Sequence, residues 1–142
     1  MKSPLKPLPQ PTPQPTPLGV LTVTWHEREN LAEVTYQRMV LDGPQILDQW
    51  RRQLMSQLEA IHRQLGRRFN LLVCIDELTI RASVADGYGE TAKTVLSRLC
   101  PRIARYGMSS TVRPLIAAEA LKMDYKANLF DNRAAAVKFL QG

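Results

Sequence analysis

Two short runs near the start of the chain alternate apolar and polar side chains. In residues 21–26, and again in residues 32–37, every second residue is apolar. A period of two is typical of a strand with one buried face. Because only a short polar break at residues 28–30 lies between the two runs, we predict a β-hairpin over residues 19–38.

The next stretch repeats its apolar residues at steps of three and four. The stripe consists of Leu47, Trp50, Leu54, Leu58, Ile61 and Leu65. This spacing places all six on one face of an α-helix. Asp42, Gly43 and Pro44 precede the stripe as a helix start, and Gly66 follows it as a C-terminal stop. We therefore predict a long amphipathic helix between them.

Shorter patterns predict the elements that follow. Residues 70–76 are mostly apolar without alternation, as expected of a strand that helices cover on both faces. A second helix is predicted from Asp86 and Gly87 onward, and Pro101 should end it because proline lacks the amide hydrogen. We interpret residues 103–107 as a short turn after that helix.

The last part of the chain is predicted to hold one more strand and one more helix. Residues 111–117 resemble a strand, and Pro114 indicates that this strand lies at a sheet edge or carries a bulge. Asp131 is positioned to cap a helix over residues 131–140, whereas residues 118–130 fit either a helical turn or a loop. The order β-β-α-β-α-β-α predicts an α/β fold in which helices pack against a mixed sheet.

Composition separates the first 18 residues from the rest. They hold seven of the ten prolines in the chain and offer no apolar face. We expect residues 1–18 to be a disordered tail of polyproline-II character, followed by a single domain over residues 19–142. We interpret the tail as a linker or spacer. The alternative is that it binds to a groove of another protein that recognises Pro-x-x-Pro segments.

The same composition favours a cytoplasmic protein. Lys2 is followed by no apolar segment of a secretory signal, and no apolar run approaches the ~20 residues of a membrane helix. Cys74 and Cys100 belong to no Cys-x-x-Cys pair, which favours reduced thiols.

Chemical motifs are sparse. His26 and His62 lack a suitably spaced Ser, Cys or Asp, so we interpret both as surface residues and predict neither an enzyme nor a metal site. Asp76 and Glu77 are read as the end of a strand. The segment 87–89, Gly-Tyr-Gly, is too short for a phosphate loop, and we expect no cofactor.

Basic residues provide one alternative function. The formal net charge is +6, a modest excess that permits acidic partners. Arg98, Arg102 and Arg105 would align on a continuous helix and form a nucleic-acid-binding face. We regard a solvated helix face as the better interpretation, because few aromatic residues accompany them.

Two local segments carry a family resemblance. One is the apolar strand ending in Asp76 with its loop to the helix at Asp86 and Gly87; the other is Asn-Leu-Phe-Asp at 128–131, leading into the alanine-rich stretch 133–140. With the element order over residues 19–141, these segments are similar to the STAS superfamily of sulfate-transporter and anti-sigma-factor-antagonist domains. The resemblance implies a small α/β interaction module.

In the antagonist branch of that superfamily, the loop and helix after the central strand bind a kinase-like anti-sigma partner, and phosphorylation of a loop serine switches binding. The usual motif is Asp-Ser-Ser-Gly. Aligned on Gly87, this chain has Val-Ala-Asp at 84–86 and therefore no hydroxyl at the switch position. Ser83 is the nearest serine and the candidate phosphorylation site.

The resemblance thus predicts a non-catalytic protein-interaction module of a bacterial signalling pathway. Its expected partner is a kinase-like or anti-sigma-like regulator, bound through Ser83, Asp86, Gly87 and Tyr88. A nucleic-acid-associated basic protein is one alternative. A STAS-like domain that binds a small ligand or lipid is another.

Overall fold

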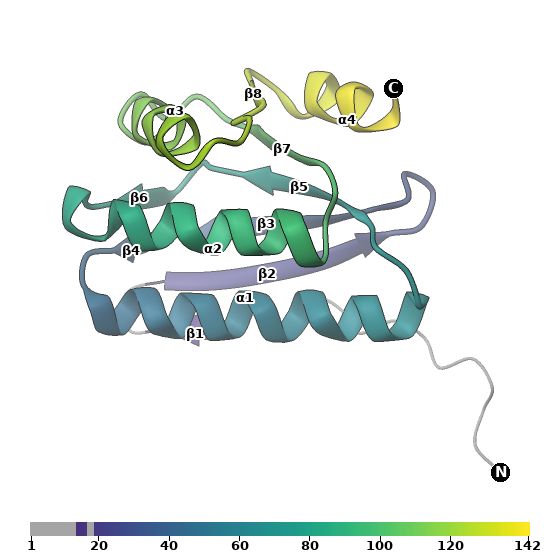
Figure 1. The fold of residues 1–142 in the computed structure, drawn as a ribbon, viewed down its shortest axis with the longest axis horizontal. Helices are drawn as coiled ribbons and strands as arrows, with labels where there is room; N and C mark the ends of the chain where they lie inside the picture. Colours follow the sequence, from purple (N-terminus) through teal and green to yellow (C-terminus); the bar gives the residue numbers. More distant parts are fainter. Residues whose placement is uncertain (1–13, 17–18) are drawn as a thin grey trace, which may run out of the picture.

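The computed structural model describes residues 14–16 and 19–142, and these form a sheet with helices on both faces (Figure 1). The strands are β1 Gln14–Thr16, β2 Gly19–His26, β3 Leu31–Gln37, β4 Met39–Leu41, β5 Asn70–Cys74, β6 Leu78–Ile80, β7 Ile103–Tyr106 and β8 Leu129–Phe130. The helices are α1 Pro44–Leu65, the short 3₁₀ turn η1 Ala82–Val84, α2 Ala85–Arg98, α3 Val112–Met123 and α4 Arg133–Gln141.

The main sheet has the strand order β1-β2-β3-β5-β7-β8 in the described part of the chain. β2 and β3 form the predicted antiparallel hairpin, and β3, β5, β7 and β8 run parallel. A parallel step needs a crossover, which α1, α2 and α3 provide in turn. β4 and β6 form a separate parallel pair, which the sequence analysis did not predict. The predicted mixed α/β fold is confirmed.

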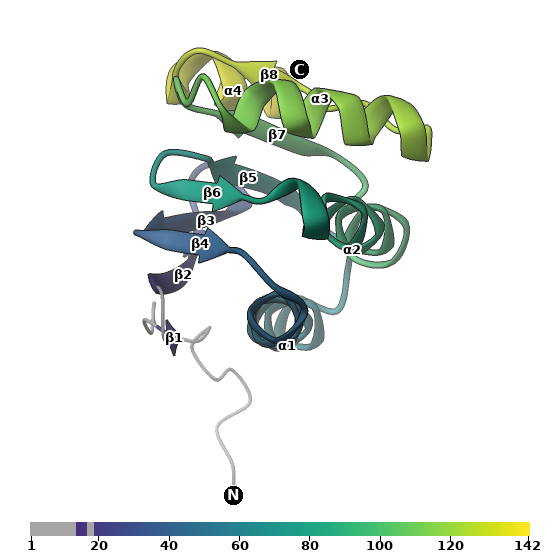
Figure 2. The ribbon, with the colours of Figure 1, turned by 90° about the vertical axis from the view of Figure 1, so that its left-hand side faces the viewer.

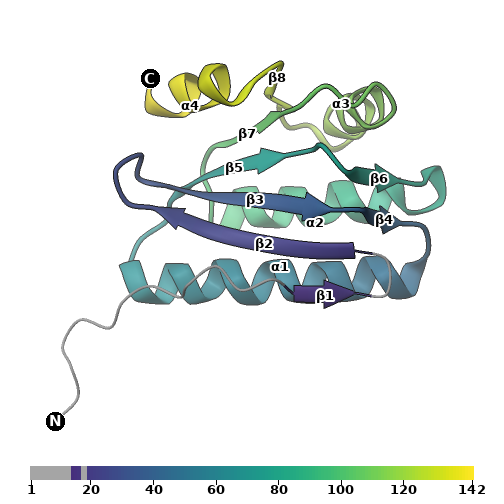
Figure 3. The same ribbon diagram turned by 180° about the vertical axis from the view of Figure 1, so that it is seen from behind.

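Each face of the sheet has its own helices. The larger core lies beneath α1, α2 and α3, whereas α4 packs on the opposite face, against β5 and β7 (Figure 2). The predicted stripe on α1 is confirmed, because Leu47, Trp50, Leu54, Leu58 and Ile61 are all buried. On the α4 side no helix of the described chain lies in front of β2 and β3 (Figure 3).

Two predictions in the second half of the chain are wrong. Residues 103–107 were expected as a turn, but Ile103–Tyr106 form β7 between β5 and β8. Residues 111–117 were expected as a strand, but they open helix α3. Pro114 lies in the first turn of that helix, where a missing amide hydrogen breaks no intrahelical bond. The unassigned residues up to Met123 complete α3.

The cap of the last helix is also one residue later than expected. Asn132, and not Asp131, is the N-cap of α4, and its side-chain oxygen accepts a hydrogen bond from the Ala135 amide at 2.9 Å. Asp131 is exposed and lies 3.4 Å from the guanidinium of Arg113.

The expected tail falls largely outside the described residues. Residues 1–13 and 17–18 are not described, but Gln14–Thr16 pair antiparallel with β2 and form one edge of the sheet (Figure 3). None of the described helices is long and apolar enough to cross a membrane.

Candidate functional site: the outer face of α2 and α3

Two of the four predicted contact residues lie at the surface. Ser83 is exposed in η1, and Asp86 is exposed in the first turn of α2. The Asp86 carboxylate accepts a hydrogen bond from Lys122 Nζ of α3 at 2.7 Å. This bond lowers the pKa of Asp86 and raises the pKa of Lys122. The start of α2 therefore carries a fixed charge pair beside a free hydroxyl.

The other two predicted contact residues face inward. Tyr88 is 3% exposed and stacks on Trp50 of α1, with ring centroids 5.3 Å apart. A Cβ at Gly87 would overlap Leu47 of α1, and a Cβ at Gly89 would lie 2.8 Å from Glu119 of α3. The two glycines let α2 approach α1 and α3 closely. Tyr88 is a core residue, which a partner cannot reach.

Helix α3 presents an apolar stripe to solvent. Its inner side buries Val112, Ile116 and Ala120. The outer side exposes Pro114, Ala117, Ala118 and Leu121. These four lie at positions i, i+3, i+4 and i+7, the spacing of a buried helix face. Leu121 is 85% exposed, and Met108 just before α3 is 67% exposed.

The start of α2 and the end of α3 are held together. Besides the bond between Asp86 and Lys122, Lys93 Nζ of α2 donates to the Met123 carbonyl oxygen of α3 at 2.8 Å. Lys122 directly follows Leu121, so the charge pair borders the apolar stripe. We call Ser83, Asp86, Lys122 and the outer α3 stripe the α2–α3 surface.

The three arginines of the proposed nucleic-acid face do not share a face. Arg98 ends α2 and lies 3.7 Å from Glu59 of α1. Arg102 lies between α2 and β7 and donates to the carbonyl oxygens of Phe139 and Leu140 in α4. Arg105 is in β7 and buried. Pro101 separates them, because the helix that would align them ends at Arg98.

The sequence analysis missed a polar cluster on the α4 side of the sheet. Glu33 of β3 is 6% exposed. Its carboxylate accepts hydrogen bonds from the Tyr106 hydroxyl and from Arg133 Nε at 3.1 Å, and His26 Nε2 lies 2.8 Å from Oε1. Arg133 also donates to Glu29 at 2.7 Å and 3.0 Å. The cluster ties the hairpin and β7 to the start of α4.

The protonation states in this cluster are those expected of a structural role. Burial alone would raise the pKa of Glu33, but the hydrogen bonds from Arg133 and Tyr106 outweigh it and lower the pKa. Burial and the bond to Glu33 raise the pKa of Tyr106. Cys74 lies on the same face, and burial raises the pKa of its thiol, which keeps it protonated and unreactive. Each ionised group has a committed partner.

The side chains of Asp76 and Glu77 also accept hydrogen bonds from the backbone of nearby loops. Asp76 Oδ1 accepts from the Met108 amide at 3.2 Å, and Glu77 Oε1 accepts from the Arg38 amide at 3.1 Å. Both cysteines are free. The described residues contain no group of His, Cys, Asp and Glu side chains with the arrangement of a metal site.

Comparison with known proteins does not assign this chain to a family. No protein-family model, curated protein or solved structure matches this chain.

Proposed function

We propose that this chain is a non-catalytic, STAS-like protein-interaction module that works in the bacterial cytoplasm and binds a kinase-like or anti-sigma-like regulator. The observation that supports it is the outer stripe of α3. A contiguous apolar patch that is rimmed by polar residues is a feature of protein-binding surfaces. The adjoining pair, Asp86 and Lys122, provides the polar border that such surfaces have.

Ser83 gives this surface a means of regulation. It is exposed, lies just before α2 and is three residues from Asp86. The helix dipole would favour a phosphate there, whereas the Asp86 carboxylate would repel it. A phosphate on Ser83 would compete with Asp86 for Lys122 and place negative charge beside the apolar stripe. We therefore expect phosphorylation to weaken binding.

The test maps the contact before it measures affinity. A photo-crosslinking amino acid at Leu121 should capture one protein in cells of the source organism, whereas the same group at the exposed Ala134 of α4 should not. The captured protein is then purified. Leu121→Glu should weaken its affinity by about tenfold or more, because charge in an apolar contact is strongly unfavourable.

The controls separate binding from folding. Ala134→Glu changes another exposed helix position and should bind as the unaltered chain does. All variants should melt within a few degrees of one another, since exposed substitutions change stability by about 0.5 kcal/mol or less. Equal affinity of Leu121→Glu and Ala134→Glu would reject the α2–α3 surface. Capture of nucleic acid alone would reject the protein-interaction function.

A further inference from the structure

Arg105 is a charged side chain inside the apolar core. Along β7, Ile103 and Arg105 face α1 and α2, whereas Ala104 and Tyr106 face α4. Arg105 is 2% exposed. Because a guanidinium stays protonated in proteins, this position buries a full positive charge.

The chain compensates this charge only in part. Arg105 Nη1 donates to the Ala127 carbonyl oxygen at 2.9 Å, and the guanidinium carbon lies 5.9 Å from the centre of the Tyr125 ring. Arg105 Nε is buried without a hydrogen-bond partner in the described chain. No carboxylate of the described residues forms an ion pair with it. A buried charge in this state is strongly unfavourable.

Glu119 of α3 forms no ion pair with Arg105 in the described chain. It is buried, and its Oε1 also has no hydrogen-bond partner. Burial and the hydrogen bond with Asp86 raise the pKa of Glu119. Its one ionised neighbour on the same helix, Lys122, is already paired with Asp86.

Arg105 lines a small cavity. The cavity has a volume of about 20 Å³ and lies between the sheet, α1 and α2. Apart from Arg105, its walls are apolar and aromatic, and they include Tyr36, Trp50 and Tyr88. About 10–15 Å³ suffices for one water-sized group. The cavity therefore has room for a single small species beside a fixed positive charge.

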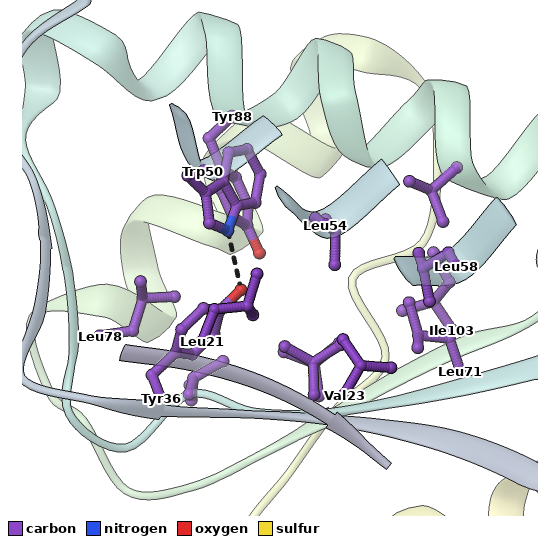
Figure 4. Close-up of a cluster of buried hydrophobic side chains, with 14 of the residues drawn as sticks. Leu21, Val23, Tyr36, Trp50, Leu54, Leu58, Leu71, Leu78, Tyr88 and Ile103 are labelled. Atoms are coloured by element: carbon purple, nitrogen blue, oxygen red, sulfur yellow. Dashed lines mark hydrogen bonds between the residues drawn. The ribbon is translucent and has the colours of Figure 1, made fainter. Parts of the chain in front are cut away.

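Tyr36 adds a second donor to the same cavity. Its oxygen accepts a hydrogen bond from Trp50 Nε1 at 3.0 Å, which leaves the hydroxyl proton available to donate (Figure 4). Burial raises the pKa of Tyr36, so the hydroxyl keeps that proton. The cavity is thus lined by the cationic Arg105 and by the hydroxyl-bearing Tyr36 and Tyr88, and its other walls are apolar or aromatic.

We propose that this cavity binds one small monovalent anion of the size of chloride, held by Arg105 Nε and the Tyr36 hydroxyl. A single guanidinium matches a single negative charge. The volume excludes tetrahedral oxyanions and acids with an apolar body. Low polarity of the walls strengthens the attraction between anion and guanidinium. A neutral water of the same size would satisfy the hydrogen bond but leave the charge uncompensated.

Trp50 reports on this site directly. Bromide quenches indole fluorescence, and Trp50 forms part of the cavity wall. The background variant Trp25→Phe, which removes the other tryptophan, is prepared in gluconate and titrated with bromide at constant ionic strength. Quenching should saturate, and chloride should reverse it by competition. Arg105→Met should raise the half-saturating bromide concentration by about tenfold or more, since it removes a charged hydrogen bond.

Matched variants make the result decisive. Arg98→Met removes an exposed arginine and should leave the titration unchanged. If Arg105→Met fails to fold, Tyr36→Phe replaces it, with a smaller increase expected. Quenching that rises linearly with bromide and is equal in all variants is collisional and would overturn the proposal. So would crystals of the unaltered chain grown in bromide that show no anomalous peak within about 3.5 Å of Arg105 Nε.

Discussion

Glu33 and Arg105 are buried charges on opposite faces of one sheet, and they differ in how the chain compensates them. Glu33 has side-chain partners from three elements: His26 of β2, Tyr106 of β7 and Arg133 of α4. Arg105 has one backbone carbonyl and one ring face. The charge on the α4 side is neutralised within the fold, whereas the charge on the α1/α2 side is not.

The contrast is sharpest within β7 itself. Tyr106 is part of the Glu33 cluster, and the preceding residue, Arg105, points to the other core. Adjacent residues of β7 thus belong to two different networks. The hydrogen bonds of the Glu33 network are complete, whereas those of Arg105 are incomplete. Since buried polar groups in native proteins are nearly always satisfied, the incomplete network is the one where an outside ion is to be sought. Three perturbations test this difference, beginning with the largest expected effect.

Removing the partner of Glu33 should destabilise the protein most. Arg133→Ala leaves the buried carboxylate with Tyr106 and His26 alone, and we expect a loss of about 3 kcal/mol in the free energy of unfolding. Urea denaturation at neutral pH measures it. Lys138→Ala, on the exposed side of the same helix, should cost about 0.5 kcal/mol or less. Equal losses in the two variants would mean that the cluster contributes little to stability.

Acidification should weaken the Glu33 cluster with a smaller, graded effect. The folded state lowers the pKa of Glu33, so the ionised cluster stabilises the protein at pH values above the unfolded pKa, about 4.3. That contribution is lost as the pH falls through the folded pKa. Urea midpoints between pH 7 and pH 3 should therefore fall less steeply in Glu33→Gln. Parallel curves would contradict the assignment of this acid dependence to Glu33.

Removing the other charge should change stability least. In halide-free buffer, Arg105→Met replaces an uncompensated guanidinium by an apolar chain of similar length. We expect unchanged stability or a gain of about 1 kcal/mol, because replacing buried ions by apolar groups is often neutral or stabilising. Urea denaturation beside Arg133→Ala gives the comparison. A loss as large as that of Arg133→Ala would show that the Ala127 carbonyl compensates the charge by itself.

The sequence predicted the elements that have a regular period or an apolar run. The hairpin, α1, β5 and α2 follow from such patterns. β7 has only four residues, and its third is an arginine, so it carries no apolar alternation. α3 is apolar on both sides, which removes the helical period and left Thr111–Ala117 open to interpretation as a strand. Pro114 reinforced that error, although proline is also common in the first turn of a helix.

The site was harder to predict than the fold. Glu33 and Arg133 are 100 positions apart, and nothing local to either residue marks the pair. Ser83 and Asp86 were correctly expected near a helix start, yet their role in binding stays a prediction. Tyr88 could have been recognised as core, because it shares the helical spacing of the buried Ala92 and Val95.

The ends of the sheet bear on how this molecule avoids unwanted association. One outer strand, β1, is three residues long and contains Pro15, which has no amide hydrogen to offer; the other, β8, is two residues long. Short edges and edge prolines give another chain little backbone to pair with. The two ends of the described main sheet thus offer little backbone for fibril growth or for recognition by an added strand.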